Sequence, residues 1–225
     1  MSAGVRDALN AALRLGGIAL VAVALLAGVH LLTREPIAGS ERRAALQALE
    51  LVMPAAQYDN DLLEDRVQVR APAWLGLPSA TVHRARLDGQ PSGLVLDANA
   101  PDGYAGDIRL LIGVDAEGRV LGVRVTAHAE TPGLGDRIET RRSDWIHDFA
   151  GRTLGQPPLE RWKVRRDGGD FDQFAGATVT PRAVVKAVRR ALQFVQRHGE
   201  AIQAAEPGAT LRFDDAPDAP DAPSP

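Results

Sequence analysis

The chain has 225 residues and contains no cysteine. This absence excludes disulfide bonds, thiolate nucleophiles, zinc–thiolate sites, cysteine-ligated iron–sulfur clusters and c-type haem attachment. The net charge is only −3, so no strong basic field attracts nucleic acid, and no nucleic-acid partner is expected. A redox cofactor, if the protein carries one, must therefore be held by side chains other than cysteine.

Catalytic and metal-binding constellations are also scarce. No Ser–His–Asp arrangement or paired carboxylates suited to acid–base chemistry stand out, so no catalytic residue is predicted. His128 and Glu130 are two residues apart with no third ligand nearby. Asp167, Asp170 and Asp172 do not reproduce the spacing of an EF-hand calcium loop. The sequence therefore predicts no metal site.

The most informative stretch covers residues 172–181 and reads Asp-Gln-Phe-Ala-Gly-Ala-Thr-Val-Thr-Pro. Gly176 and Ala177 are small, so another group can approach the backbone closely at this point. Thr178 presents a hydroxyl immediately after them. From the residues alone, an ordinary Gly-Ala loop before a helix is the alternative to a binding site.

A helix is predicted directly after this stretch. Thr180 is expected to be its N-cap and Pro181 its first helical residue, and Gly199 is a plausible stop. Apolar residues then recur at helical spacing: Val184, Val185, Val188, Leu192 and Val195. Free N–H groups and the positive end of the helix dipole favour a phosphate near the hydroxyl of Thr178.

Near the amino terminus, residues 15–32 form an uncharged run of 18 residues between Arg14 and Arg34. As a helix this run is about 27 Å long, close to the roughly 30 Å thickness of a bilayer core. The alternative is a cleaved signal peptide, but the run is longer than a usual signal core. A single uncleaved transmembrane helix is predicted.

The middle of the chain has the pattern of an antiparallel sheet. Four strands are predicted, at residues 80–87, 93–99, 108–115 and 120–128, and the short turns between them favour a meander. Short helices are expected from Ser40 to Pro54 and over residues 143–151, while residues 55–78 look irregular. The predicted fold class is α+β: an antiparallel β-meander packed with helices and preceded by one N-terminal transmembrane helix.

These patterns divide the chain into three parts. Residues 1–36 form a tail and membrane anchor, and residues 37–205 form one globular domain. Residues 206–225 are rich in Asp, Ala and Pro, which cannot bury enough apolar surface to fold, so a disordered tail is expected there.

A second unusual stretch follows the last predicted strand, at residues 128–136. It reads His-Ala-Glu-Thr-Pro-Gly-Leu-Gly-Asp, and its two glycines and one proline specify an unusual backbone path. Leu134 lies between the glycines, which is odd for a loop that faces only water.

Both stretches resemble motifs of one family. Residues 172–178 resemble the flavinylation motif Asp-x-x-(Ser/Thr)-Gly-Ala-Thr and depart from it only at Ala175. Residues 128–136 resemble the signature loop of the FMN-binding domain in the G subunit of the Rnf electron-transport complex. The related C subunit of the sodium-translocating NADH:quinone reductase has a similar loop. The resemblance covers roughly residues 10–205.

The resemblance implies an electron-carrier subunit of a complex that couples electron transfer between NADH and ferredoxin to ion transport. It implies FMN joined covalently through its phosphate to Thr178 by a flavin transferase. The implied partners are the other subunits of the Rnf membrane complex. The implied location is the bacterial inner membrane, with one membrane pass and the globular domain on the periplasmic side. The candidate cofactor-binding residues are Thr178, Gly176, Ala177, Thr131, Leu134 and Glu130.

Two other functions fit the sequence less well. One is a flavin subunit of a sodium-translocating NADH:quinone reductase. The other is a membrane-anchored structural or sensory module whose Gly-Ala-Thr loop carries no cofactor. Colour that survives denaturation would separate the flavoproteins from the cofactor-free module.

Overall fold

The computed structural model describes residues 3–217, and the chain divides into two units, residues 1–45 and residues 46–225. Helix α1 (Ala3–Glu50) makes up the described part of the first unit. A separate helix start at Ser40 was predicted and is wrong, because α1 is continuous through that position. The last turn of α1 already belongs to the second unit.

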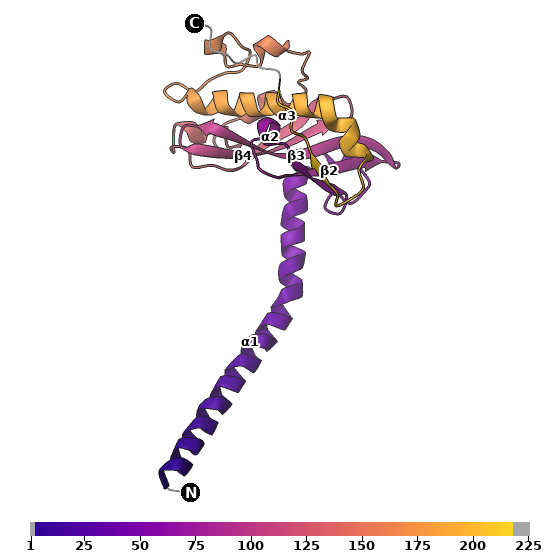
Figure 1. Cartoon of the computed structure of the whole chain (residues 1–225). Coiled ribbons are helices and arrows are strands. Elements are labelled where there is room, and N and C mark those ends of the chain that lie inside the picture. The colour runs from indigo at the N-terminus through magenta and orange to yellow at the C-terminus, as the bar shows by residue number, and fades with distance from the viewer. Residues whose placement is uncertain (1–2, 218–225) are drawn as a thin grey trace. The chain divides into compact units, whose positions relative to one another are not determined.

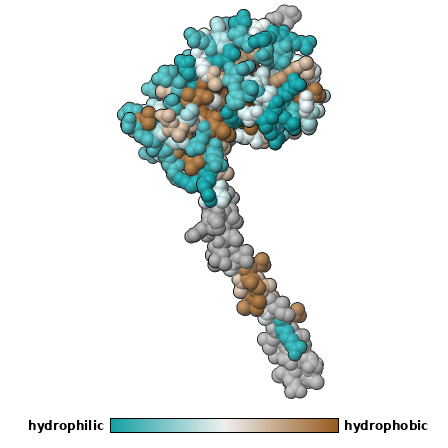
Figure 2. Space-filling model, turned by 180° about the vertical axis from the view of Figure 1, so that it is seen from behind, coloured by the Kyte–Doolittle hydropathy of each residue, from teal (hydrophilic) through white to brown (hydrophobic). Residues whose placement is uncertain are grey.

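The uncharged run at residues 15–32 lies within α1. Its described apolar side chains are highly exposed, for example Leu20 at 71% and Val21 at 58%, and they form a hydrophobic stretch along the helix (Figure 2). Among the residues described, the structure contains no helix whose length and apolarity suffice for crossing a membrane. Membrane spanning by residues 15–32 therefore stays a prediction.

The second unit is built on a six-stranded sheet with the strand order β5-β4-β3-β2-β1-β6. Neighbouring strands are antiparallel except β1 and β6, which are parallel. The strands are β1 (Arg66–Arg70), β2 (Ala80–Leu87), β3 (Gln90–Gly103), β4 (Gly106–Asp115), β5 (Val120–Ala127) and β6 (Thr210–Arg212). The α+β class and the meander of β2 to β5 are confirmed, but the sheet as a whole is mixed.

Residues 55–78 are more regular than expected. They contain β1, the short helix α2 (Pro72–Leu75) and the 3₁₀ helix η1 (Ala55–Gln57). The expectation of irregular structure rested on Pro72 and Pro78. Pro72 lies at the first position of α2, where its missing N–H costs nothing.

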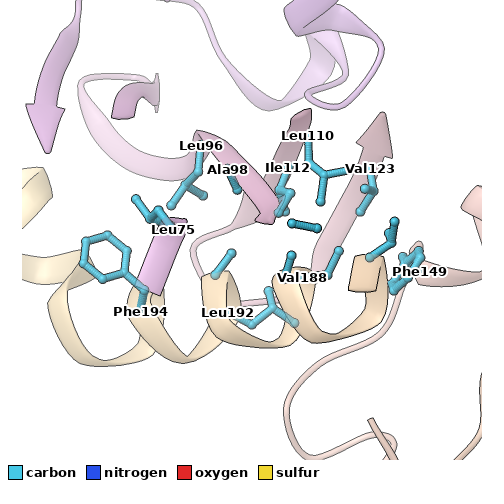
Figure 3. Close-up of a cluster of buried hydrophobic side chains, with 14 of the residues drawn as sticks. Leu75, Leu96, Ala98, Leu110, Ile112, Val123, Phe149, Val188, Leu192 and Phe194 are labelled. Atoms are coloured by element: carbon cyan, nitrogen blue, oxygen red, sulfur yellow. The ribbon is translucent and has the colours of Figure 1, made fainter. Parts of the chain in front are cut away.

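Helix α3 (Val179–Ala204) covers one face of the sheet (Figure 1). Its side chains Val188 and Leu192 point at Leu96, Ala98 and Ile112 of the strands (Figure 3). This face carries the main hydrophobic core, and burial of such side chains is the dominant stabilising contribution. The predicted helical periodicity of α3 is confirmed.

Four 3₁₀ helices complete this layer. The predicted helix at residues 143–151 is the 3₁₀ helix η3, and it buries Trp145, Ile146 and Phe149 as expected. The four are η2 (Gly135–Ile138), η3 (Trp145–Phe149), η4 (Leu159–Arg161) and η5 (Arg165–Asp167).

The opposite face of the sheet is covered by the last turn of α1 and the segment that follows it. Leu49, Val52 and Met53 are buried there in a second apolar cluster with Leu62 and side chains of the sheet. A Cβ on Gly113 would lie 2.0 Å from the carbonyl oxygen of Val52, so only glycine lets the segment approach this closely. The Val-Met-Pro sequence at residues 52–54 therefore packs the start of the globular unit against this face of the sheet.

Helix α3 was predicted to stop at Gly199, but it continues to Ala204. Two arginines of β2 contact the end of the longer helix. Arg84 Nη1 donates to the carbonyl oxygen of Ile202 at 3.2 Å, and Arg86 Nη2 donates to that of Gln203 at 3.1 Å. These contacts satisfy carbonyl groups that have no partner within a helix end.

The tail expected to be disordered from residue 206 is ordered in part, which corrects that expectation. Strand β6 pairs with β1, and Phe213 packs against the rings of Phe194 and His198 at centroid distances of 5.4 and 4.2 Å. Leu211 and Phe213 supply the apolar surface that the Asp-Ala-Pro composition lacks. The remainder of the expected tail, residues 218–225, lies outside the described residues.

Candidate functional site

One cavity of about 290 Å³ brings together all the predicted site residues. Its walls come from three segments: the β3–β4 hairpin, the loop after β5, and the start of α3. The predicted residues Glu130, Thr131, Leu134, Gly176, Ala177 and Thr178 line it together with Tyr104, Gly135, Val179 and Thr180. Two stretches that lie more than 40 residues apart in sequence thus share one site.

The hydroxyl of Thr178 is available for chemistry. Thr178 occupies the N-cap position of α3, but its side chain makes no capping hydrogen bond. Within the described part of the chain, the amides of Val179 and Thr180 also donate no hydrogen bond, as expected for the first helical N–H groups. An anion attached to Thr178 would therefore find free donors beside it.

The backbone before Thr178 requires glycine. Gly176 has φ 79°, a conformation that side chains rarely adopt, and a Cβ there would meet only Leu134 Cδ2, at 4.0 Å. Ala175 and Gly176 are exposed, and Ala177 is half-buried. The loop therefore leaves space for a bulky group next to the hydroxyl.

Thr180 has a different role from the predicted one. It is fully buried in the first turn of α3 and is not the N-cap. Its hydroxyl donates to Glu130 Oε2 at 2.6 Å. A hydrogen bond to an ionised carboxylate is stronger than one between neutral groups, so this contact is favoured over capping. The helix consequently begins at Val179, with Thr178 at the N-cap position.

Glu130 joins the three walls of the cavity. Only 4% of its surface is exposed, and its second oxygen, Oε1, accepts a hydrogen bond from the Ala105 N–H at 3.1 Å. A Cβ on Gly103 or Gly135 would lie within 2.8 Å of a Glu130 oxygen, so both positions require glycine. Glu130 therefore braces the site and does not present a free carboxylate to a ligand.

The loop after Glu130 is held by its own backbone. The N–H groups of Leu134 and Gly135 both donate to the carbonyl oxygen of Thr131 at 3.1 Å, and Gly133 N–H donates to Asp136 Oδ1 at 2.8 Å. Leu134 itself is 45% exposed at the cavity rim. The loop therefore presents an apolar side chain to whatever occupies the cavity.

His128 supports this loop from outside the cavity. The Glu130 N–H donates to His128 Nδ1 at 3.0 Å, so Nε2 carries the proton that it shares with Glu139 Oε1 at 2.7 Å. Hydrogen bonds from Arg141 and His128 lower the pKa of Glu139 to about 2. Among the described residues, no group of three potential ligands could hold a metal ion.

The three aspartates that precede Thr178, at positions 167, 170 and 172, each form an ion pair. Asp167 pairs with Arg182, Asp170 with Arg161, and Asp172 with Arg165. The hydrogen bond from Arg182 lowers the pKa of Asp167. These pairs are partly to fully exposed to solvent and lie in the segment that leads to Thr178.

Tyr104 also lines the cavity but is not among the predicted site residues. It lies at the tip of the β3–β4 hairpin and is 73% exposed. An aromatic residue within a Gly-Tyr-Ala-Gly turn was the available signal, because turns usually carry small or polar residues.

We predict that Glu130→Gln lowers the free energy of unfolding by about 1–3 kcal/mol, because one buried partner loses its acceptor. A glutamine has one acceptor oxygen, which cannot serve both the Ala105 N–H and the Thr180 hydroxyl as the carboxylate does. Guanidinium unfolding followed by tryptophan fluorescence measures the change. Glu117→Gln, at an exposed turn position, is the control. Equal stability of the two variants would contradict the bracing role.

Comparison with known proteins agrees with this geometry. Residues 103–193 match the FMN-binding domain, a range that contains every residue of the cavity, and residues 1–52 match the RnfG N-terminal region.

Similar proteins match over most of the chain. It is 52% identical over 205 residues to the G subunit of the ion-translocating oxidoreductase complex of Pseudomonas aeruginosa, covering 91% of this chain and 96% of that protein. The corresponding G subunits of Vibrio atlanticus and Cronobacter sakazakii are 45% and 49% identical, covering 83% and 79% of this chain and 89% and 85% of theirs. The predicted resemblance is confirmed: the chain belongs to the family of G subunits of ion-translocating oxidoreductase complexes, the Rnf family.

Proposed function

We propose that this protein is the FMN-carrying electron-transfer subunit of an ion-translocating oxidoreductase complex, with FMN joined through its phosphate to the hydroxyl of Thr178. The observation that carries the proposal is the Thr178 hydroxyl, which makes no capping hydrogen bond and lies in a cavity lined by both family motifs. Membership of the G-subunit family and the matched FMN-binding domain support it.

The residues of the cavity fit the two chemical parts of FMN. Next to Thr178, the free amides of Val179 and Thr180 suit a phosphate. Farther from the helix, Tyr104 and Leu134 offer apolar surface to the flavin ring. FMN would supply the electron-carrying chemistry, and the protein would hold and orient it.

A covalent link also has a physical rationale. The cavity opens to solvent, because Tyr104, Leu134 and Val179 are all exposed at its rim. A cofactor bound there only by contacts could dissociate, whereas a phosphoester keeps it in place. No general base or nucleophile is required of the protein once the link is made.

The attachment loop is accessible to a maturation enzyme. Asp172, Ala175 and Gly176 are exposed, so a flavin transferase can reach the motif without unfolding the domain. Ala175 stands where the family motif has Ser or Thr, but its side chain does not line the cavity. The proposed attachment therefore depends on Thr178 and not on a hydroxyl at position 175.

The test is the mass of the full-length protein purified from a host that supplies the flavin transferase. The denatured protein should be heavier than its sequence by one FMN less one water, and the modified peptide should carry the addition on Thr178. An unmodified mass, or FMN on another residue, would refute the proposal.

We further propose that the chain is anchored in a membrane. We expect residues 15–32 to anchor the chain in the inner membrane as one uncleaved helix, with the domain on the periplasmic side. The support is the uncharged run within α1, the exposure of its described apolar side chains and the matched RnfG N-terminal region. Partners would then be the other subunits of the complex.

A reporter that is active only after export, fused behind Pro225, should be active and remain in the membrane fraction. The matched control lacks residues 1–36 and should be inactive in the cytoplasm. Activity from the control, or release of the active fusion in soluble form, would exclude an uncleaved exporting anchor.

A further inference from the structure

Exposed apolar side chains of the globular unit gather at one place. Five large hydrophobic residues are exposed in the described part of residues 46–225. Three of the five, Tyr104, Leu134 and Val179, line the cavity that contains Thr178. Apolar surface that clusters around a cavity indicates a binding site more strongly than scattered residues do.

Tyr104 is the largest and most exposed of the three. Its hairpin is held tightly: Gly103 pairs with Gly106, whose φ is 111°, and Ala105 N–H donates to Glu130 Oε1 at 3.1 Å. A Cβ on Gly103 would lie 2.2 Å from the carbonyl oxygen of Gly106, so this close pairing of the two strands requires glycine at position 103. The backbone beside Tyr104 is therefore held by the hairpin pairing and by Glu130, while 73% of the Tyr104 side chain is exposed.

The position of this hairpin relative to Thr178 is fixed as well. One oxygen of Glu130 binds the hairpin, and the other binds Thr180, two residues after Thr178. The buried carboxylate thus holds the aromatic wall and the attachment point in one rigid arrangement. A flat, apolar ligand attached to Thr178 would therefore face the ring of Tyr104 on one side of the cavity.

On this basis, and resting on the proposed function, we infer that Tyr104 is a positioning residue that packs against the isoalloxazine ring of the Thr178-linked FMN. Aromatic rings pack favourably in offset-stacked or edge-to-face arrangements, and tyrosine adds an electron-rich phenol. Tyr104 would therefore cover part of the ring and hold it against the loop that carries Leu134.

The aromatic content of the chain makes this inference easy to test. The sequence has two tyrosines and three tryptophans. The tryptophans Trp74, Trp145 and Trp162 are at most 7% exposed, and none lines the cavity. Tyr58 packs in the cluster on the opposite face of the sheet. Tyr104 is thus the one electron-rich ring of the described residues that lines the cavity.

A phenol in contact with a photoexcited flavin donates an electron to it and takes the electron back without emission of light. Flavin on the native full-length protein should therefore be weakly fluorescent. Tyr104→Phe keeps a ring but removes the electron donor, and Tyr104→Leu removes the ring, so both should raise the fluorescence per bound flavin several-fold. Tyr104→Trp should stay dim, as should the control Tyr58→Phe.

Intact mass separates this inference from the proposed function. If the native protein carries no FMN, the proposed function fails. If all variants carry FMN but Tyr104→Phe and Tyr104→Leu stay as dim as the native protein, or if the native flavin is already bright, Tyr104 does not contact the ring. Because the side chain is 73% exposed, these substitutions should leave the domain folded.

Discussion

Thr178→Ala should abolish covalent flavin attachment completely while the protein remains folded. The Thr178 side chain makes no capping hydrogen bond and is half-buried, so its removal exposes no buried polar group. An alanine has no oxygen to form the phosphoester. Intact mass and flavin fluorescence of the denatured protein measure the loss, and guanidinium unfolding should show a change within about 1 kcal/mol, at the level of a weak N-cap.

Thr180→Ala is the matched control, because it removes the second hydroxyl near the helix start. It should keep the flavin but lower the free energy of unfolding by about 1–3 kcal/mol, since the buried carboxylate of Glu130 loses a donor. This cost comes from the lost contact with Glu130, not from a lost cap. A Thr178→Ala protein that still carries FMN covalently, or a Thr180→Ala protein that loses it, would overturn the assignment.

The candidate site was predictable where local sequence carries the chemistry. The Gly-Ala-Thr loop and the Thr-Pro-Gly-Leu-Gly loop each require glycine at positive φ or at a close approach, and both stood out for that reason. What sequence could not give was the pairing of Thr180 with Glu130. That hydrogen bond joins residues 50 positions apart, so no local pattern indicates it. In addition, Thr-Pro followed by apolar residues at helical spacing is equally typical of an N-cap.

The fold, too, was predictable only where the signal is local in the sequence. Strand β2 and the meander were predictable because turn residues and apolar runs are local. Strand β6 was not, because its three residues form a strand only by pairing with β1, about 140 positions earlier. The end of α3 was missed for a similar reason. Gly199 is a common stop signal, but carbonyl groups beyond it are satisfied by arginines on β2.

Arg84 is the more deeply buried of the two arginines that contact the end of α3. Its side chain is 1% exposed, forms an ion pair with Asp65 and reaches the carbonyl oxygens of Ile202, Gln203 and Ala205. Asp65 also pairs with Arg86 at 2.8 Å, so the charges form a network at the end of α3. A buried charge in such a network is costly to leave without its partner.

Arg84→Met should therefore lower the free energy of unfolding by about 1.5–3 kcal/mol, the cost of losing hydrogen bonds to a charged group, while Asp65 keeps Arg86 as its ion-pair partner. Methionine keeps the aliphatic length, so the loss reports on the charge and its hydrogen bonds rather than on packing. Unfolding of the full-length protein in detergent can be followed by tryptophan fluorescence, since all three tryptophans lie in the globular unit. Arg119→Met is the control: its pair with Asp115 is 3.8 Å long and half-exposed, so it should cost less than about 1 kcal/mol. A loss for Arg84→Met no larger than that of the control would show that β2 does not hold the end of α3.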